Sequence, residues 1–359
     1  MKILHLPTSV GGNSYGLSRA ERKLGLGSDV LTTYENYFDY PSDINLDLSK
    51  FNFSENAKFR RLKEIRRFLR IKKFFFKLNT KYDVFHFNFG RSLFRDYTDL
   101  DYYNGSKKLF VTYNGCDCRQ KYKIIEKYDI CACSYPECYD GVCNTSEVDC
   151  KKQERIIKMS NYCSTFFYLN PDIKQFLPEN AVFLPYSIAS WDSIVNKERK
   201  YQYPLKIVHA PSQRGAKGTK IILSIIEKIK TDFPDKIEFI LVEGLKNSEA
   251  IKIYEHADIL IDQILIGWYG ALSVEAMKAG CAIMVYIRES DFQYIPPAMH
   301  EDIKNTFINC NKHNLYSKIA EIIENPDLLK KYSNYSYNYV NTWHNPEYVA
   351  SITKEYYEN

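Results

Sequence analysis

The sequence predicts an α/β protein built from two tandem Rossmann-like domains with a ligand cleft between them. Short runs rich in β-branched and aromatic residues alternate with longer segments of helical period, a pattern typical of βαβ units around a parallel sheet. This rhythm occurs twice along 359 residues, a length that suits two domains, and 45% hydrophobic residues is ordinary for folded cores.

The expected elements follow from that rhythm. In the first half we expect strands at 2–6, 30–33, 84–88, 109–113, 165–169 and 182–184. In the second half we expect strands at 205–209, 238–242, 258–261, 282–286 and 306–308, with helices at 217–230, 248–256, 271–279 and 315–324. A charged segment between Pro185 and Pro204 suits a linker, so we place an N-terminal domain at 1–187 and a C-terminal domain at 188–333.

Composition and hydropathy limit the classes to which the protein can belong. The start has too short an apolar run for a signal peptide, and no stretch approaches the roughly 18 apolar residues of a membrane helix. We therefore expect a cytoplasmic protein, in which the ten cysteines are thiols or metal ligands rather than disulfides.

Three loops that follow strands carry the candidate site. Ligands of open α/β sheets bind at the carboxyl ends of strands. Gly11-Gly12 follows the first strand, Asn114-Gly115 follows the fourth, and the stretch from Arg214 to Gly218 follows the first strand of the second domain. All three are expected to face a shared cleft.

Arg214 and Lys217 precede a long helix. An arginine fork and a lysine point charge beside a helix N-terminus suit a diphosphate and stabilise it as a leaving group. The alternative is two exposed cations on a surface turn.

Glu275 lies in a helix whose small neighbours, Ala271, Ala276, Ala279 and Gly280, allow close approach. Its carboxylate can accept hydrogen bonds from two neighbouring hydroxyls, as a ribose presents them. The alternative is an acid placed at the helix start for the dipole.

These motifs together resemble family 4 glycosyltransferases, which have the GT-B fold. The resemblance spans the chain and is carried by the Gly11-Gly12 loop, the Arg214/Lys217-Gly218 group and Ser273-Val274-Glu275-Ala276-Met277-Lys278-Ala279-Gly280. It implies that Arg214 and Lys217 are catalytic and hold the donor pyrophosphate, and that Glu275 contacts the ribose. The donor would also be bordered by Gly11, Gly12, Gly218 and Gly270.

The resemblance further implies a nucleotide-sugar donor, retention of configuration, no catalytic metal, and a final segment, 334–359, that packs back on the first domain. Two positions depart from the family. Gly267 stands where the family often has a second glutamate, and Asn114 where it has a histidine. Contacts to the sugar or acceptor are then expected from Asn114, Asp117, Trp268 and Tyr269.

Cysteines are concentrated in an insertion at 114–150. The candidates for metal ligands are Cys116, Cys118, Cys131, Cys133, Cys138 and Cys143. Four thiolates suit a structural zinc ion, which would shape the acceptor side. The alternatives are an iron–sulfur cluster and free thiols.

The segment 58–77 holds ten cations against one acid, interleaved with aromatic and aliphatic residues. It predicts an amphipathic helix that could bind an anionic membrane surface and meet a lipid-linked acceptor. The alternatives are an ordinary helix with a solvated basic face and a nucleic-acid-binding helix, for which no recognition motif is present.

The preferred function is transfer of a sugar from a nucleotide-sugar donor to a glycan or lipid-linked acceptor by a cytoplasmic, peripheral enzyme. One alternative is a nucleotide-sugar epimerase or hydrolase of the same fold. Another is a zinc-stabilised protein that binds nucleic acid through its basic helix.

Overall fold

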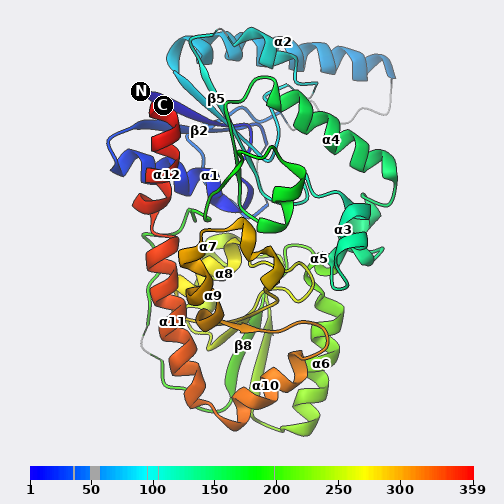
Figure 1. Ribbon diagram of the computed structural model, residues 1–359, viewed down its shortest axis with the longest axis vertical. Helices are drawn as coiled ribbons and strands as arrows, with labels where there is room; N and C mark the ends of the chain where they lie inside the picture. Colours follow the sequence, from blue (N-terminus) through cyan, green and yellow to red (C-terminus); the bar gives the residue numbers. More distant parts are fainter. Residues whose placement is uncertain (35–36, 49–56, 95, 104, 198) are drawn as a thin grey trace.

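The molecule contains two parallel β-sheets, one in its upper half and one in its lower half as drawn in Figure 1. The computed structural model describes residues 1–359 apart from 35–36, 49–56, 95, 104 and 198, and the side chains of 57–61 and 67 lie outside the described residues too. The expected α/β class with two Rossmann-like domains is confirmed.

The upper sheet has seven strands in the order β3-β2-β1-β4-β5-β6-β7. Their bounds are β1 Lys2–Leu6, β2 Gly27–Thr32, β3 Ile44–Asn45, β4 Val84–Asn88, β5 Lys108–Tyr113, β6 Thr165–Tyr168 and β7 Val182–Phe183. Helices α1 (Asn13–Lys23), α2 (Ala57–Lys81), α3 (Lys121–Lys127) and α4 (Ser146–Ser160) belong to this half.

The lower sheet has five strands in the order β12-β11-β10-β8-β9. Its strands are β8 Leu205–His209, β9 Ile237–Leu241, β10 Ile259–Ile261, β11 Ala282–Val285 and β12 Phe307–Asn309. The helices are α5 Arg214–Lys217, α6 Thr219–Asp232, α7 Asn247–Tyr254, α8 Ala271–Lys278, α9 His300–Thr306, α10 Leu315–Glu324, α11 Asp327–Trp343 and α12 Pro346–Glu358.

Each expected strand overlaps an observed one, because the buried parallel strands are continuous apolar runs. Two differences from the expected elements have a clear local cause. Strand β3 has only two residues, too few for any periodicity to show. The helix expected at 217–230 is divided at Gly218, which has φ 77° and ends α5 before α6 begins.

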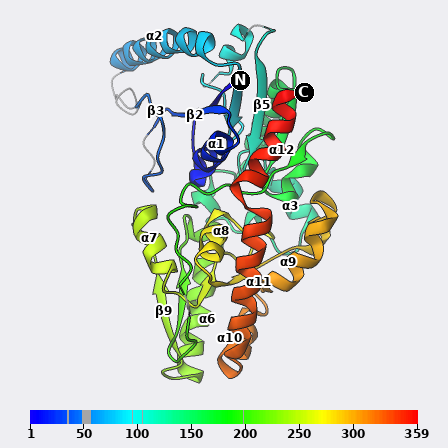
Figure 2. The same cartoon turned by 90° about the vertical axis from the view of Figure 1, so that its left-hand side faces the viewer.

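The last two helices connect the halves of the molecule. Helix α11 lies along the lower sheet, and α12 continues upward to pack against α1 (Figures 1 and 2). No helix among the described residues has the length and apolar character needed to cross a bilayer.

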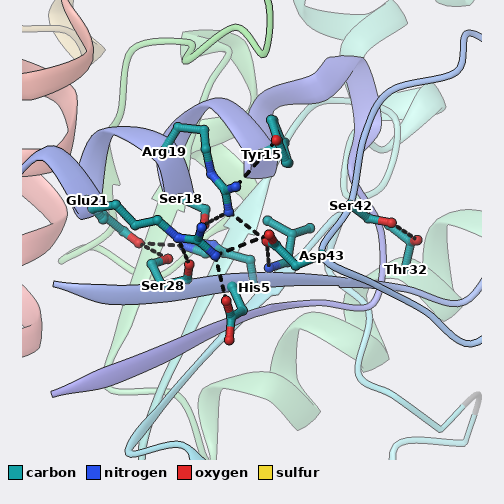
Figure 3. Close-up of polar contacts among 12 residues, drawn as sticks. His5, Tyr15, Ser18, Arg19, Glu21, Ser28, Thr32, Ser42 and Asp43 are labelled. Atoms are coloured by element: carbon teal, nitrogen blue, oxygen red, sulfur yellow. Dashed lines mark hydrogen bonds and ion pairs between the residues drawn. The ribbon is translucent and has the colours of Figure 1, made fainter.

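A buried polar network fixes α1 between β1, β2 and α12. Glu21 of α1 has no exposed surface, and its Oε2 lies 2.8 Å from His5 Nε2 and accepts from Ser28 Oγ over 2.6 Å (Figure 3). Its Oε1 accepts from Thr353 Oγ1 at 3.1 Å and from Tyr357 Oη at 3.0 Å. Outside this network, the same helix is held to the sheet edge by an Arg19–Asp43 ion pair at 2.6 Å.

Candidate functional site

The glycine loop after β1 meets the first turn of α8 from the other domain. Gly11 has φ 60°, and a Cβ there would lie 3.4 Å from Ala271 Cβ. Gly12 has φ 69°, and a Cβ there would approach the Tyr40 ring to 2.7 Å. Both glycines are therefore required by backbone conformation, and Gly12 by space as well.

Lys217, at the end of α5, is paired with a buried carboxylate. Its Nζ donates to Asp262 Oδ1 over 2.5 Å, and the Asp262 side chain is fully buried while that of Lys217 is 13% exposed. The other oxygen, Oδ2, accepts from the Gly270 N–H and from Ser273 Oγ, both at 2.8 Å. Asp262 thus joins the end of α5 to the start of α8.

Burial by itself raises the pKa of Asp262, but the charge of Lys217 and the hydrogen bonds outweigh it, so this pKa lies below the usual range. The aspartate is therefore ionised at neutral pH. Lys217 and Asp262 form an ion pair that carries no net charge.

Arg214, one turn earlier in the chain, turns to a different acid. Its Nε donates to Glu243 Oε1 at 2.8 Å and its Nη2 to Oε2 at 2.5 Å, a two-pronged contact. The pair lies at the surface, because the arginine side chain is 59% exposed. Arg214 and Lys217 are thus on the same short helix but have separate acidic partners.

Gly218 and Gly270 lie close to these cations. A Cβ on Gly218 would lie 2.7 Å from Ile264 Cγ1, so this glycine lets α5 pack on the loop after β10. A Cβ on Gly270 would lie 3.5 Å from Lys217 Nζ. The backbone at Gly270 therefore passes directly beside the ammonium group.

Glu275 is buried one turn into α8, with 2% of its surface exposed. Burial raises its pKa to about 7, although hydrogen bonds from Asn247 and Ser190 act in the opposite direction. Oε1 accepts from Asn247 Nδ2 at 2.8 Å and from Ser190 Oγ at 3.2 Å. At neutral pH this carboxyl is close to the midpoint of its titration.

An aromatic segment of the upper domain reaches across to this carboxyl. Asn247 Nδ2 donates to the Tyr40 hydroxyl over 3.4 Å, and the backbone N–H of Asn247 donates to the Phe38 carbonyl over 3.0 Å. Asp39 pairs with Lys246 at 2.9 Å. Residues 37–40 therefore connect the glycine loop to the start of α7.

These contacts bring five of the expected donor residues together around the N-terminus of α8: Gly11, Gly12, Lys217, Gly270 and Glu275. Sequence reasoning missed Asp262, Asn247, Ser190 and Tyr40. The first two follow β10 and β9, so the rule that sites lie after strands could have identified them. Ser190 and Tyr40 lie in segments without a motif and carried no such signal.

Trp268 and Tyr269, expected as sugar contacts, are each only 1% exposed. Their rings stack at 4.7 Å, and Tyr269 Oη lies 2.8 Å from Tyr339 Oη and 3.0 Å from His344 Nε2. Trp268 Nε1 has no hydrogen-bond partner among the described residues. The structure thus places both rings in the interior, where Tyr269 anchors the loop before α8 to α11 and Trp268 packs edge-on against Phe183 of β7.

Asn114 and Asp117 lie at the carboxyl end of β5. Asp117 accepts from the backbone N–H of Asn114 at 2.8 Å and of Gly115 at 2.6 Å. The Asn114 carbonyl accepts from Asn170 Nδ2. Asp117 therefore shapes this loop, and a contact of either side chain with a sugar stays a prediction.

The zinc site expected among the cysteines of the insertion at 114–150 stays a prediction. No group of three or more Cys, His, Asp or Glu residues within the described part of the chain is arranged to hold a metal ion. Cys116 accepts from Arg119 Nη1 at 3.2 Å, Cys143 lies 3.3 Å from Lys152 Nζ, and Cys131 lies 3.1 Å from Ser134 Oγ. Of the remaining candidates, Cys118 is buried beside the Gly115 carbonyl, and burial raises the pKa of Cys133 and Cys138 to about 12.

The cysteine-rich insertion instead packs on the lower domain. A Cβ on Gly215, in α5, would lie 2.5 Å from the Glu137 carbonyl oxygen. Arg288 lies over the Tyr128 ring at 3.7 Å and donates to the Ile130 carbonyl at 2.9 Å. The insertion therefore covers the helix that carries Arg214 and Lys217.

No protein family profile matches the chain, and no curated protein matches it in sequence. Solved structures do match. Sucrose-phosphate synthase (tll1590) from Thermosynechococcus elongatus superposes with a TM-score of 0.59 at 12% identity, over 100% of this chain and 98% of that one. WaaG, a glycosyltransferase involved in lipopolysaccharide biosynthesis, gives 0.54 at 11% identity, over 98% and 99%.

UDP-GlcNAc 2-epimerase from Neisseria meningitidis, solved with UDP-GlcNAc, gives a TM-score of 0.53 at 12% identity over the full length of both chains. Because these identities are low, the likeness shows the fold. The chain has the two-domain GT-B fold, which glycosyltransferases and this epimerase share.

Proposed function

We propose that the protein is a glycosyltransferase that takes a sugar from a nucleotide-sugar donor and passes it to a glycan or lipid-linked acceptor. The observation that supports this most is that Lys217 and the Gly11-Gly12 loop meet the N-terminus of α8, the helix that carries Glu275. A cation and a glycine backbone suit the diphosphate of a donor, and a carboxyl suits the hydroxyls of its ribose.

In this proposal Lys217 and Arg214 bind the diphosphate and stabilise the charge that develops on it as the sugar leaves. Glu275 binds the ribose hydroxyls in its ionised form. We further propose that the anomeric configuration is retained and that no metal takes part; NMR of the product anomer, with and without EDTA, tests both.

The test begins with a thermal-shift screen of nucleotide sugars, since a donor that binds the native state raises the melting temperature. The best donor is then assayed for a lengthened glycan by mass spectrometry. Lys217→Ala and Glu275→Gln should each lower donor affinity about tenfold or more. Lys220→Ala, an exposed lysine one turn further along, is the matched control. Unchanged affinity in both site variants would refute the assignment.

A nucleotide-sugar 2-epimerase is the second candidate, favoured by the fold likeness to the UDP-GlcNAc 2-epimerase. The same assay distinguishes the two. An epimerase yields an altered free or nucleotide-linked sugar without acceptor, whereas a transferase yields a longer glycan only when acceptor is present.

For the acceptor side, we propose that α2 binds an anionic membrane surface. The helix buries Ile71, Phe75 and Leu78 against the upper domain. Its opposite face exposes Leu62, Ile65, Leu69 and Phe76, each between 44% and 58%. Cations at Arg66, Lys73 and Lys77 lie beside this exposed stripe in the helical sequence. The side chains of Lys58, Arg60, Arg61 and Arg67, which belong to the same basic segment, lie outside the described residues.

A further inference from the structure

The two cations proposed to hold the donor diphosphate are both matched by built-in acids. Arg214 pairs with Glu243 and Lys217 with Asp262, so these four side chains carry no net charge at neutral pH. The two pairs differ in burial. Glu243 is 33% exposed, whereas Asp262 is 0% exposed. Water weakens the first pair much more than the second.

Asp262 is held rigidly. Its own N–H donates to the Met284 carbonyl at 3.0 Å, and both its carboxylate oxygens are used by Lys217, Gly270 and Ser273. An ammonium carries three N–H donors, and Asp262 takes one of them. The remaining donors of Lys217 can turn to phosphate oxygens while the pair stays intact.

We propose that Asp262 is a positioning residue and permanent counter-ion of Lys217, which aims the ammonium at the donor diphosphate and limits how tightly the released nucleoside diphosphate is bound. This inference rests on the proposed function. A buried negative charge close to a bound diphosphate repels it, so the site binds the departing product more weakly than a lone lysine would. The consequence is faster product release.

The low pKa of Asp262 agrees with this role, because the carboxylate remains charged through the neutral range. A purely structural role predicts the opposite effect of mutation. If Asp262 only oriented Lys217 and the start of α8, removing it would weaken anion binding.

Asp262→Asn tests the difference, with inorganic pyrophosphate and UDP as probes in isothermal titration calorimetry. Asparagine keeps an oxygen for the Gly270 N–H and Ser273 and removes the charge, while its NH2 takes the place of the oxygen that accepts from Lys217. We expect both probes to bind about tenfold tighter than to the native protein. Lys217→Ala should bind them about tenfold more weakly. Glu243→Gln, which removes the exposed counter-ion of Arg214, should tighten binding less than about twofold.

Ser273→Ala separates position from charge, since it removes a hydrogen bond to Asp262 but leaves the carboxylate; it should not tighten binding. If Asp262→Asn unfolds, Asp262→Ser is measured in the same way. Equal or weaker probe binding in the Asp262 variant, with Lys217→Ala still weakened, overturns this inference and leaves the donor site standing. Unchanged binding in Lys217→Ala overturns the donor site and this inference together.

Discussion

Tyr357, near the end of the chain, donates a hydrogen bond to Oε1 of Glu21 over 3.0 Å and so joins the last helix to the first. The same hydroxyl lies 2.5 Å from His86 Nδ1 on β4. All three side chains are fully buried. One hydroxyl therefore satisfies two buried polar groups on separate elements of the upper domain.

Tyr357→Phe should destabilise the protein by about 1–3 kcal/mol, because it leaves Glu21 and His86 each short of a partner in the interior. Urea unfolding followed by circular dichroism measures this. Tyr335→Phe, on an exposed ring of α11, is the matched control and should change the free energy of unfolding by less than about 0.5 kcal/mol. A loss of stability no larger than that of the control would show that the Tyr357 hydroxyl contributes nothing to the free energy of unfolding.

Glu275 should make stability fall as the pH rises from about 4.5 to about 7. Its pKa in the folded protein is about 7, above the ordinary value of 4.5 that applies when the chain is unfolded. In this window the folded state binds the extra proton, so raising the pH favours unfolding, by up to about 3 kcal/mol.

Buried histidines act in the opposite direction over part of this range, since burial lowers the pKa of His209 and His344 to about 4. The difference between native protein and Glu275→Gln therefore isolates the glutamate. Urea unfolding between pH 5 and pH 7.5 should show the native protein losing stability relative to Glu275→Gln. Parallel pH profiles for the two proteins would contradict the elevated pKa.

Gly12 and Gly25 offer a matched test of the cleft loop. Both have a left-handed backbone, with φ of 69° and 82°, but a Cβ on Gly25 would meet nothing within 4 Å whereas one on Gly12 would strike the Tyr40 ring. Gly25→Ala should therefore cost only the backbone strain, about 1 kcal/mol. Gly12→Ala should cost about 1–2 kcal/mol more and weaken donor binding, because Tyr40 must move away from Asn247.

Thermal unfolding and calorimetry with UDP measure the two effects. A Gly12→Ala protein as stable as Gly25→Ala would show that the Tyr40 segment does not pack on the loop as described.

The strands could be predicted because a buried parallel strand is a continuous apolar run. The loops that carry the candidate site could be predicted because ligands of such sheets bind at the carboxyl ends of the strands. Lys217 and Glu275 were found through motifs. Their partners carried no motif. Asp262 directly follows β10, where sites are expected, whereas Ser190 meets Glu275 only through the fold: their hydrogen bond spans 85 positions. The spacing of the cysteines suggested four convergent thiolates. Cys116, Cys131, Cys133 and Cys138 do line one cavity, together with Arg119 and Asp172, and a metal bound there stays a prediction.

The exposed face of α2 should bind vesicles that contain phosphatidylglycerol and not vesicles of phosphatidylcholine alone. Apolar side chains on this face would enter the interface while neighbouring lysines and arginines attract anionic headgroups. Vesicle sedimentation at 50 mM and 500 mM salt should show binding that weakens as salt rises, because added salt shortens the Debye length and screens the attraction to the headgroups. Ile65→Glu with Leu69→Glu should lower binding about tenfold or more, since both side chains are over half exposed.

Ile157→Glu, an equally exposed isoleucine on α4, is the control and should bind as the native protein does. Unchanged binding in Ile65→Glu with Leu69→Glu, or loss of binding in the control alone, would rule out α2 as the membrane-facing surface. Equal binding to both kinds of vesicle would contradict the preference for anionic headgroups.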